Sequence, residues 1–502
     1  MTEQTRALSK RQKFLMIAAL LTGAFMGITN ETLLATALPS IQRAFDITTG
    51  QVQWMTTAFL MANGIMIPVS AFLIDRFSTR GLFLTSIGLF GVGTAVASMA
   101  PVYPVLLLGR VVQASGSGIM LPLLMTVLLA VIPVHRRGTA MGLMGIVIAF
   151  GPAIGPTLSG FLLEHFVWRS LFITILPIVA VTLIVGALFI RNVTDLRQPR
   201  IDVLSIILSS FGFGSFLYGF SIAGESGWTS PLVVTSISAG AVIIGLFVWR
   251  QLVLNVPMLE FRVFQFPMFT LAIIISMTVL VSLIGAETLL PLFMQTVLGF
   301  TPLQSGLVLL PGAIVMGIMS PITGRLFDAF GAKWLAMIGL TVVTITTFLL
   351  SRLSLDTTFA YLSIVFAIRM AGLALALMPV MTSALNQLPA KWYSHGSAMA
   401  NTLQQISAAI GTAILVTVMA IAAQNAPVIV DITAREAALE AQLYGYSWAF
   451  FASTILAFIA FILAWFLNSP KKEKEIVRQI HGQPANSADT AAPASGDSDT
   501  SD

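Results

Sequence analysis

The sequence has no cysteine and little charge. None of its 502 residues is Cys, and only 9% are Asp, Glu, Lys or Arg, whereas soluble globular proteins carry about 25% charged residues. A chain without cysteine forms neither disulfides nor thiolate metal sites. The 4 histidines do not lie at ligand spacing from one another, so we expect no metal site. With 57% hydrophobic residues, this chain is expected to be an integral membrane protein.

Enzymes and nucleic-acid binders are disfavoured on the same grounds. The sequence has no phosphate-binding glycine loop and no nucleophile constellation, so we expect no enzyme, no cofactor and no ATP-driven step in this chain. The net charge of +5 comes from short loops between apolar runs, where basic residues act as topology signals and not as a nucleic-acid surface.

Long apolar runs take the place of charge. A helix needs about 20 mostly apolar residues to cross the hydrocarbon core of a bilayer. The basic N-terminal stretch resembles the start of a signal peptide. The apolar run after it is too long for one and has no cleavage site, so we expect this run to be retained as the first span. The sequence predicts fourteen spans, at roughly 14–38, 54–74, 82–101, 104–132, 139–163, 170–190, 203–222, 232–250, 267–294, 303–325, 333–351, 357–383, 396–423 and 446–467.

The basic residues set the expected orientation. Two of the 26 lysines and arginines, Arg110 and Arg369, lie inside spans. If both termini are cytoplasmic, 20 of the remaining 24 fall in cytoplasmic segments and only 4 outside. This asymmetry satisfies the positive-inside rule, so we expect a multi-pass protein of a cytoplasmic membrane with both termini inside.

Three pairs of features repeat at nearly one spacing. The tetrapeptide Glu-Thr-Leu-Leu occurs twice inside apolar runs, 256 positions apart; a basic loop with an aspartate recurs after 253 positions, and an arginine within a span recurs after 259. Duplication of a six-span half, with two further spans inserted between the copies, explains all three. The pairs are Glu31 and Glu287, Asp75 and Asp328, and Arg110 and Arg369.

These observations predict an all-α membrane protein made of two six-helix halves and two inserted central helices. We expect a cytoplasmic N-terminus at 1–13, an N-terminal half at 14–190, linkers with the inserted helices at 191–266, a C-terminal half at 267–467 and a disordered cytoplasmic tail at 468–502.

Several stretches resemble the major facilitator superfamily, in particular its fourteen-span drug:proton antiporter branch. The loop from Ala71 to Arg80 resembles the signature G-x-L-x-D-R-x-G-R-K, with Ala71 and Ser78 in place of glycines. Arg110 to Gly116 resembles R-x-x-Q-G-x-G of span four, and Gly151 to Gly160 resembles the antiporter motif of span five. Further matches lie around Trp168 and from His395 to Gly411, and the word Asn-Glu-Thr-Leu-Leu resembles a lincomycin-exporter subgroup.

One position departs from the family pattern. Where many members carry an aspartate in span one, this chain has Asn30, and its acid follows as Glu31. One step along a helix turns a side chain by about 100°. Glu31 is therefore expected to face a different wall of the transport cavity from the aspartate of the family.

Glu31 and Glu287 are the predicted proton carriers. A charge at the centre of a span costs about 2.5 to 3.5 kcal/mol on insertion scales, so embedded acids are normally kept for function. Burial favours the protonated form of a carboxyl group, which brings proton binding and release within reach. Two alternatives stay open: a protonated acid that only bonds two helices, and a cation anchor without proton traffic.

The embedded arginines need partners. The resemblance implies that Arg110 is a relay beside the first-half acid; a clamp on backbone carbonyls is the alternative, and Arg369 is expected to mirror it. Gln113 either lines the cavity or ties two helices, and we favour the second. The predicted cavity residues are Asn30, Glu31, Gln113, Glu287 and Arg369.

Two further sets complete the predicted site. Charge pairs across the halves are expected to close the cytoplasmic end, with ordinary topogenic charge and helix capping as the alternative; the residues are Asp75, Arg76, Arg80, Arg325, Asp328 and Lys333. Small residues and prolines of span five are expected to bend it and to let helices approach closely, which packing alone would also explain; they are Gly145, Gly151, Pro152, Gly155, Pro156 and Gly160.

The sequence thus predicts a monomeric antiporter that exports amphipathic drugs at the expense of the proton gradient. An uptake permease of the same fold is one alternative, although it leaves the Gly-Pro motif without a reason. A membrane sensor that has lost transport is a second alternative, although it gives no reason for the embedded charges.

Overall fold

The computed structural model describes residues 9–35, 37–193, 202–427, 433–468 and 475. Nearly all of the predicted tail and most of the first linker lie outside the described residues. All of the secondary structure in the described chain is helical, and 14 helical segments are long and apolar enough to cross a membrane, which confirms the predicted fold class.

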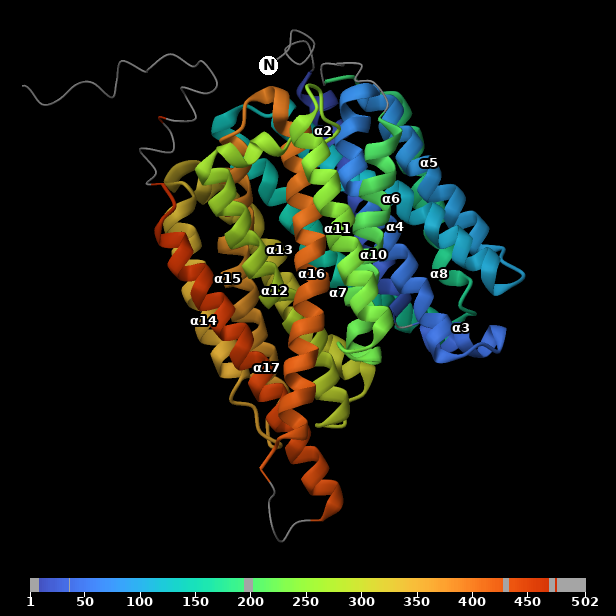
Figure 1. Cartoon of the computed structure of the whole chain (residues 1–502), viewed down its shortest axis with the longest axis vertical. Helices are drawn as coiled ribbons and strands as arrows, with labels where there is room; N and C mark the ends of the chain where they lie inside the picture. Colours follow the sequence, from blue (N-terminus) through green and yellow to red (C-terminus); the bar gives the residue numbers. More distant parts are fainter. Residues whose placement is uncertain (1–8, 36, 194–201, 428–432, 469–474, 476–502) are drawn as a thin grey trace, which may run out of the picture.

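The helices run up and down the molecule in chain order (Figure 1). We call the end at which α2 begins and α17 ends, the upper end in Figure 1, the terminal end. The helices are α2 (Lys10–Ala35), α3 (Leu38–Phe45), α4 (Thr49–Arg76), α5 (Thr79–Ser98), α6 (Tyr103–Val131), α7 (Arg137–His165), α8 (Ser170–Ile173), α9 (Leu176–Phe189), α10 (Val203–Ser226), α11 (Pro231–Val253), α12 (Pro267–Thr296), α13 (Pro302–Phe330), α14 (Ala332–Leu350), α15 (Phe359–Asn386), α16 (Tyr393–Gln424) and α17 (Ala434–Trp465).

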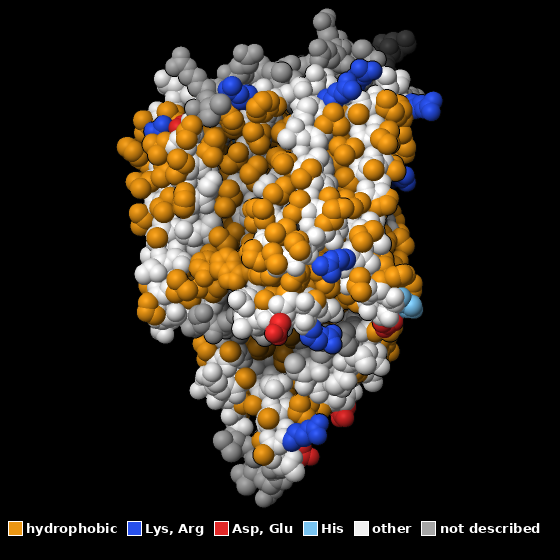
Figure 2. Space-filling model, turned by 90° about the vertical axis from the view of Figure 1, so that its right-hand side faces the viewer, with side chains coloured by type: hydrophobic (Ala, Val, Ile, Leu, Met, Phe, Trp, Pro, Cys, Tyr) orange, Lys and Arg blue, Asp and Glu red, His pale blue; other side chains and the backbone are white. Residues whose placement is uncertain are grey.

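The outer surface is apolar where a soluble protein would be polar. Ile184 on α9 is 60% exposed and Trp249 on α11 is 66% exposed. Figure 2 shows hydrophobic side chains over most of the middle of one face, with charged side chains gathered toward its two ends. A chain surrounded by lipid has no water for its backbone groups, so it must satisfy them within each helix.

Two spans depart from their predicted form. The sixth is broken into α8 and α9, and Pro177 lies in the first turn of α9, where its missing N–H is not needed. The last span was predicted to begin at 446, but α17 begins at Ala434, behind a capping box between Thr433 and Glu436. Hydropathy alone missed this polar first part of α17 because it contributes no apolar run.

The duplication extends to the ends of the helices. Thr48 caps α4 and exchanges hydrogen bonds with Gln51, while Thr301 caps α13 in the same way with Gln304. The two capping boxes lie 253 positions apart, which is the spacing of Asp75 and Asp328.

Two helix pairs form the main seams between the halves. The helices from α2 to α9 pack against one another, as do those from α12 to α17. Between these sets, α7 packs along α13, and α4 packs along α16. The inserted hairpin of α10 and α11 lies outside the second seam, where α10 contacts both α4 and α16.

Close backbone approach fixes the packing of α5 on α6. A Cβ atom on Gly116 would lie 2.7 Å from the backbone nitrogen of Phe90 and would also meet the carbonyl of Ser86, so neither neighbour can yield by rotating a side chain. The Ser86 hydroxyl donates to the carbonyl of Gly116 at 2.5 Å. Gly88, two residues from both Ser86 and Phe90, has open space around it.

We therefore expect Gly116→Ala to destabilise the protein and Gly88→Ala to leave it unchanged or slightly more stable. Overpacking a well-filled interior costs about 1 to 3 kcal/mol, whereas alanine in an open helical position gains up to about 1 kcal/mol over glycine. Thermal unfolding of the detergent-purified protein measures both. Equal melting temperatures for the two variants would contradict the packing described here.

Candidate functional site

A buried arginine lies at the centre of the first half. Arg110 on α6 is 1% exposed. Its guanidinium donates to the amide oxygen of Asn30 on α2 and, at 2.6 Å, to that of Gln113, and it stacks 4.1 Å from the ring centre of Phe59 on α4. Gln113 in turn donates to the Thr94 hydroxyl of α5 at 2.8 Å, so it links α6 to α5. Side chains of α2, α4 and α6 thus meet at one cation, and Gln113 links this contact to α5.

The acid of this half lies beside the arginine contact and not in it. Asn30 is fully buried and takes the hydrogen bond, whereas Glu31, one step along α2, is half-buried. Glu31 and Arg110 attract each other, but in the described chain they form no ion pair within 4 Å. The amide of Asn30 therefore occupies the position beside Arg110 that the resemblance implied for an acid.

The second half repeats this arrangement with different partners. Arg369 on α15 is fully buried and donates to the Thr347 hydroxyl at 3.1 Å and to the backbone carbonyl of Ser282 at 2.7 Å. Thr347 is the counterpart of Thr94, 253 positions later. Arg369 thus forms the clamp on backbone that was the alternative for Arg110. Glu287 is half-buried and interacts with Arg369 only through charge.

At the terminal end, Asp328 closes the seam of α7 and α13. Its carboxylate accepts the backbone N–H of Gly138 at 2.8 Å, and both the N–H and the hydroxyl of Thr139, at 2.9 and 2.6 Å. These are the first free N–H groups of α7, where the helix dipole favours negative charge. Asp328 forms no ion pair with Lys or Arg in the part of the chain that is described.

Asp75 closes the other seam in the same way. It accepts the Ser394 hydroxyl at 2.6 Å and lies 3.2 Å from the Nε2 of His395, both in the first turn of α16. Each aspartate of the duplicated loop therefore docks on a helix start of the other half. At Asp328 the N–H and hydroxyl groups of a helix start take the place of the predicted partners of opposite charge, because they lie within reach of the carboxylate.

Arg80, Arg325 and Lys333 of the predicted lock lie outside these contacts. Arg80 is exposed, and its backbone N–H donates to Asn192. Arg76 stacks on Phe72, and Lys333 lies 5.9 Å from the ring centre of Trp465. Arg325 is not part of either aspartate contact.

Sequence reasoning missed Arg137, which was counted as a loop charge. It is 5% exposed, donates to the Asn386 side chain at 3.0 Å and to the Leu129 carbonyl at 2.6 Å, and stacks 4.9 Å from the ring centre of Tyr393. Arg137 and Tyr393 are the first residues of α7 and α16, 256 positions apart. That spacing was the signal that could have found them.

The small residues of α7 serve two neighbours. A Cβ on Gly145 would overlap Ser320 of α13, and one on Gly151 or Gly155 would overlap α2 at Ile28 or Thr32. Gly160 is exposed and has open space around it, so close approach does not explain it. Pro152 is half-buried, and the side chain of Pro156 lies outside the described residues.

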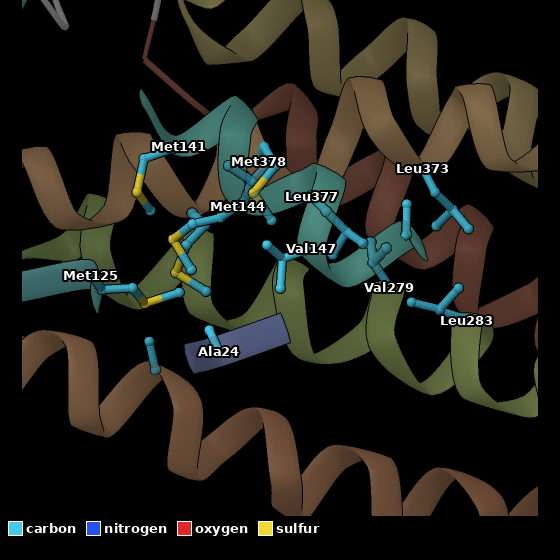
Figure 3. Packing of buried hydrophobic residues seen from close by; sticks show 14 of the residues in the cluster. Ala24, Met125, Met141, Met144, Val147, Val279, Leu283, Leu373, Leu377 and Met378 are labelled. Atoms are coloured by element: carbon cyan, nitrogen blue, oxygen red, sulfur yellow. The ribbon is translucent and has the colours of Figure 1, made fainter. Parts of the chain in front are cut away.

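Methionines fill the seam next to these glycines. Figure 3 shows Met144 of α7 beside Met378 of α15, with Met125 and Met141 nearby. All four are buried. The flexible thioether side chain adapts to irregular gaps, so this packing can change without leaving large voids.

We expect Asp328→Asn to loosen the terminal end. An amide offers one acceptor oxygen in place of two and no charge for the start of α7, so the loss is about 1 to 3 kcal/mol for the closed form. Since the chain has no cysteine, paired spin labels at this end can measure the separation without background. Asp356→Asn, at an exposed loop position, is the control; equal distance distributions for both would count against the contact.

Known proteins resemble this chain in sequence and in fold. The model of the Major Facilitator Superfamily matches residues 20–412. The uncharacterized MFS-type transporter YcnB of Bacillus subtilis is 45% identical over 92% of this chain and 96% of its own. The lincomycin resistance protein LmrB of the same organism is 42% identical over 93% and 99%. The human organic anion transporter MFSD10 has a TM-score of 0.64 at 13% identity, covering 90% of this chain and 99% of its own.

Proposed function

This chain belongs to the major facilitator superfamily, in its multidrug-efflux branch, and we propose that it is a proton-coupled antiporter that exports amphipathic drugs across the cytoplasmic membrane of a bacterium. One observation carries the proposal. Each half places a half-buried glutamate within electrostatic reach of a fully buried arginine, at equivalent positions of the repeat.

We infer the orientation from charge. The excess of basic residues in the segments at the terminal end supports a cytoplasmic position for that end, under the positive-inside rule. Hydrogen bonds that join the two halves directly, between described residues, lie in the terminal half of the molecule, at Asp75, Asp328, Arg137 and Asn401. On this reading the structure represents a state in which the cytoplasmic end is closed.

The coupling we propose uses one proton step for each change of state. A proton from the outer side binds a carboxylate oxygen of Glu31 or Glu287, which removes that group's attraction to its arginine. Neutralisation changes the relative free energy of the two conformations, and the inward-facing form releases the proton to the cytoplasm. Drug and proton then favour opposite steps of the cycle.

Arg110 is suited to a relay because side chains hold it. Asn30, Gln113 and Phe59 can each change rotamer without breaking a helix, whereas the backbone carbonyl that holds Arg369 moves only with α12. We therefore assign the adjustable role to Arg110 and a structural one to Arg369.

The cargo is proposed from the relatives. Several of them are named for lincomycin or multidrug resistance, which supports an amphipathic antibiotic and makes lincomycin the first compound to test. Uptake of a nutrient would use the same fold, but the close packing of α2, α7 and α13 at the antiporter motif favours export.

We expect drug addition to energised, everted membrane vesicles to collapse part of the proton gradient, and Glu31→Gln or Glu287→Gln to abolish this. Glutamine keeps the size and polarity of the side chain but cannot bind a proton. Glu164→Gln, at an exposed position near the end of α7, is the matched control. Full drug-induced proton movement in both site variants would exclude them as carriers.

Asp75→Asn is expected to slow turnover without weakening drug binding. The aspartate contacts the first turn of α16 at the closed terminal end, whereas Glu31 lies near the opposite end of α2. Transport rates against drug concentration separate the two effects: maximal rate should fall about tenfold, as one hydrogen bond to a charged group is worth roughly 1.5 kcal/mol or more. An unchanged maximal rate would refute the gating role.

A further inference from the structure

The inserted hairpin contacts both halves at the end opposite the terminal end. From α10, Tyr218 stacks on Trp54 of α4 with ring centres 5.3 Å apart, and Ser221 lies 3.4 Å from the hydroxyl of Thr57. From the turn that follows, the Trp228 indole N–H donates to Thr417 of α16 at 2.6 Å. The hairpin is therefore attached on both sides of the seam of α4 and α16.

At the terminal end a partly buried polar network holds the base of this hairpin. Arg250 of α11 donates to the Asp202 carboxylate at 2.9 and 3.1 Å. Partial burial acts to raise the pKa of Asp202, but hydrogen bonds from Arg250 and Ser205 outweigh it and hold the pKa below its usual value. Asp202 and Arg250 are therefore a charged pair at neutral pH.

The same network fixes the chain that leaves the hairpin. Gln251 donates to Ser205 at 2.6 Å, and its amide oxygen accepts the backbone N–H of Met258 at 2.7 Å and of Leu259 at 3.2 Å. Gln251 is 2% exposed. The next residue, Glu260, is thus presented in a defined position.

Glu260 meets the histidine of the second seam. Its backbone N–H donates to the Nδ1 of His395 at 3.3 Å, while the Nε2 of the same ring lies 3.2 Å from Asp75. A backbone N–H can only donate, so Nδ1 has to carry the lone pair. In the neutral ring the proton is then on Nε2, where it is donated to the carboxylate.

We propose that His395 is a positioning residue of the transport cycle, and that the exit of the inserted hairpin sets its tautomer through the Glu260 N–H, so that Nε2–H closes the cytoplasmic seam on Asp75. The hydrogen bond at one ring nitrogen decides which proton the other presents. This gives the two inserted helices a role in the cycle: they hold Glu260, whose N–H keeps the contact between His395 and Asp75 in place.

The inference rests on the proposed alternating-access cycle but not on its cargo or its proton carriers. Glu260→Pro removes the N–H and the side chain together, and φ at Glu260 is −82°, close to the value that proline requires. Glu260→Ala removes only the side chain and is the matched control. The cysteine-free chain accepts spin labels at Arg136→Cys and Lys391→Cys, two exposed positions on opposite halves.

Without drug or gradient, we expect Glu260→Pro to raise the ratio of open to closed cytoplasmic ends about threefold to tenfold over Glu260→Ala, the effect of one hydrogen bond. His395→Gln places an amide N–H where the Nε2 of the histidine lies. This donor does not depend on the Glu260 N–H, so the ratio of open to closed ends should stay near that of the wild type. His395→Asn keeps an acceptor for Glu260 but loses the donor to Asp75, and should open the end as much as Glu260→Pro does.

The decisive combination is Glu260→Pro in the His395→Gln protein, where the proline should have no further effect. An equal effect of the proline with histidine or glutamine at 395, or identical behaviour of Gln and Asn, would overturn the inference. Thermal unfolding of the same variants supplies a readout that needs only the closed form. If the distance between the two spin labels in the wild-type protein stays the same under every condition, the proposed alternating-access cycle is wrong. The melting temperatures of the variants then still show whether Glu260 and His395 are coupled.

Discussion

A charged side chain inside a lipid bilayer has to find its partners within the protein, and the rest of this structure depends on that constraint. Arg110 and Arg369 are met by amide oxygens, hydroxyls, a carbonyl and an aromatic ring. To assemble these groups, helices far apart in sequence must pack at fixed rotations. The glycines between α5 and α6 permit such packing, because a backbone can approach there where a side chain cannot.

The same constraint accounts for the closure at the terminal end. An aspartate at the edge of the bilayer needs donors, and the start of a helix in the other half offers free N–H groups. Such a contact is strong enough to hold two domains and simple enough to break as one unit, since all its donors lie in a single turn. Buried methionines beside it allow the neighbouring side chains to repack.

The sequence predicted the fold well because hydropathy, basic loops and a repeat spacing near 256 are local or periodic signals. Glu31, Glu287, Arg110 and Arg369 stood out for the same reason. The partners did not, since whether Arg110 meets Asn30 or Glu31 depends on helix rotation, and whether Asp328 meets Lys333 or Gly138 depends on how two halves dock. Arg137 was misjudged because a charge at a span end has the same local pattern whether it faces water or a buried asparagine.

The two arginines differ in how firmly they are held, and this has a consequence for the glutamates. Arg369 is fastened to the backbone of α12, so Glu287 on the same helix keeps a constant counter-charge through any rigid-body motion of the second half. Arg110 is fastened to side chains of α2 and α6 and faces a ring of α4, so a change of rotamer alone alters the field at Glu31. A duplicated protein can in this way give one copy of a residue pair a steady electrostatic environment and the other an adjustable one.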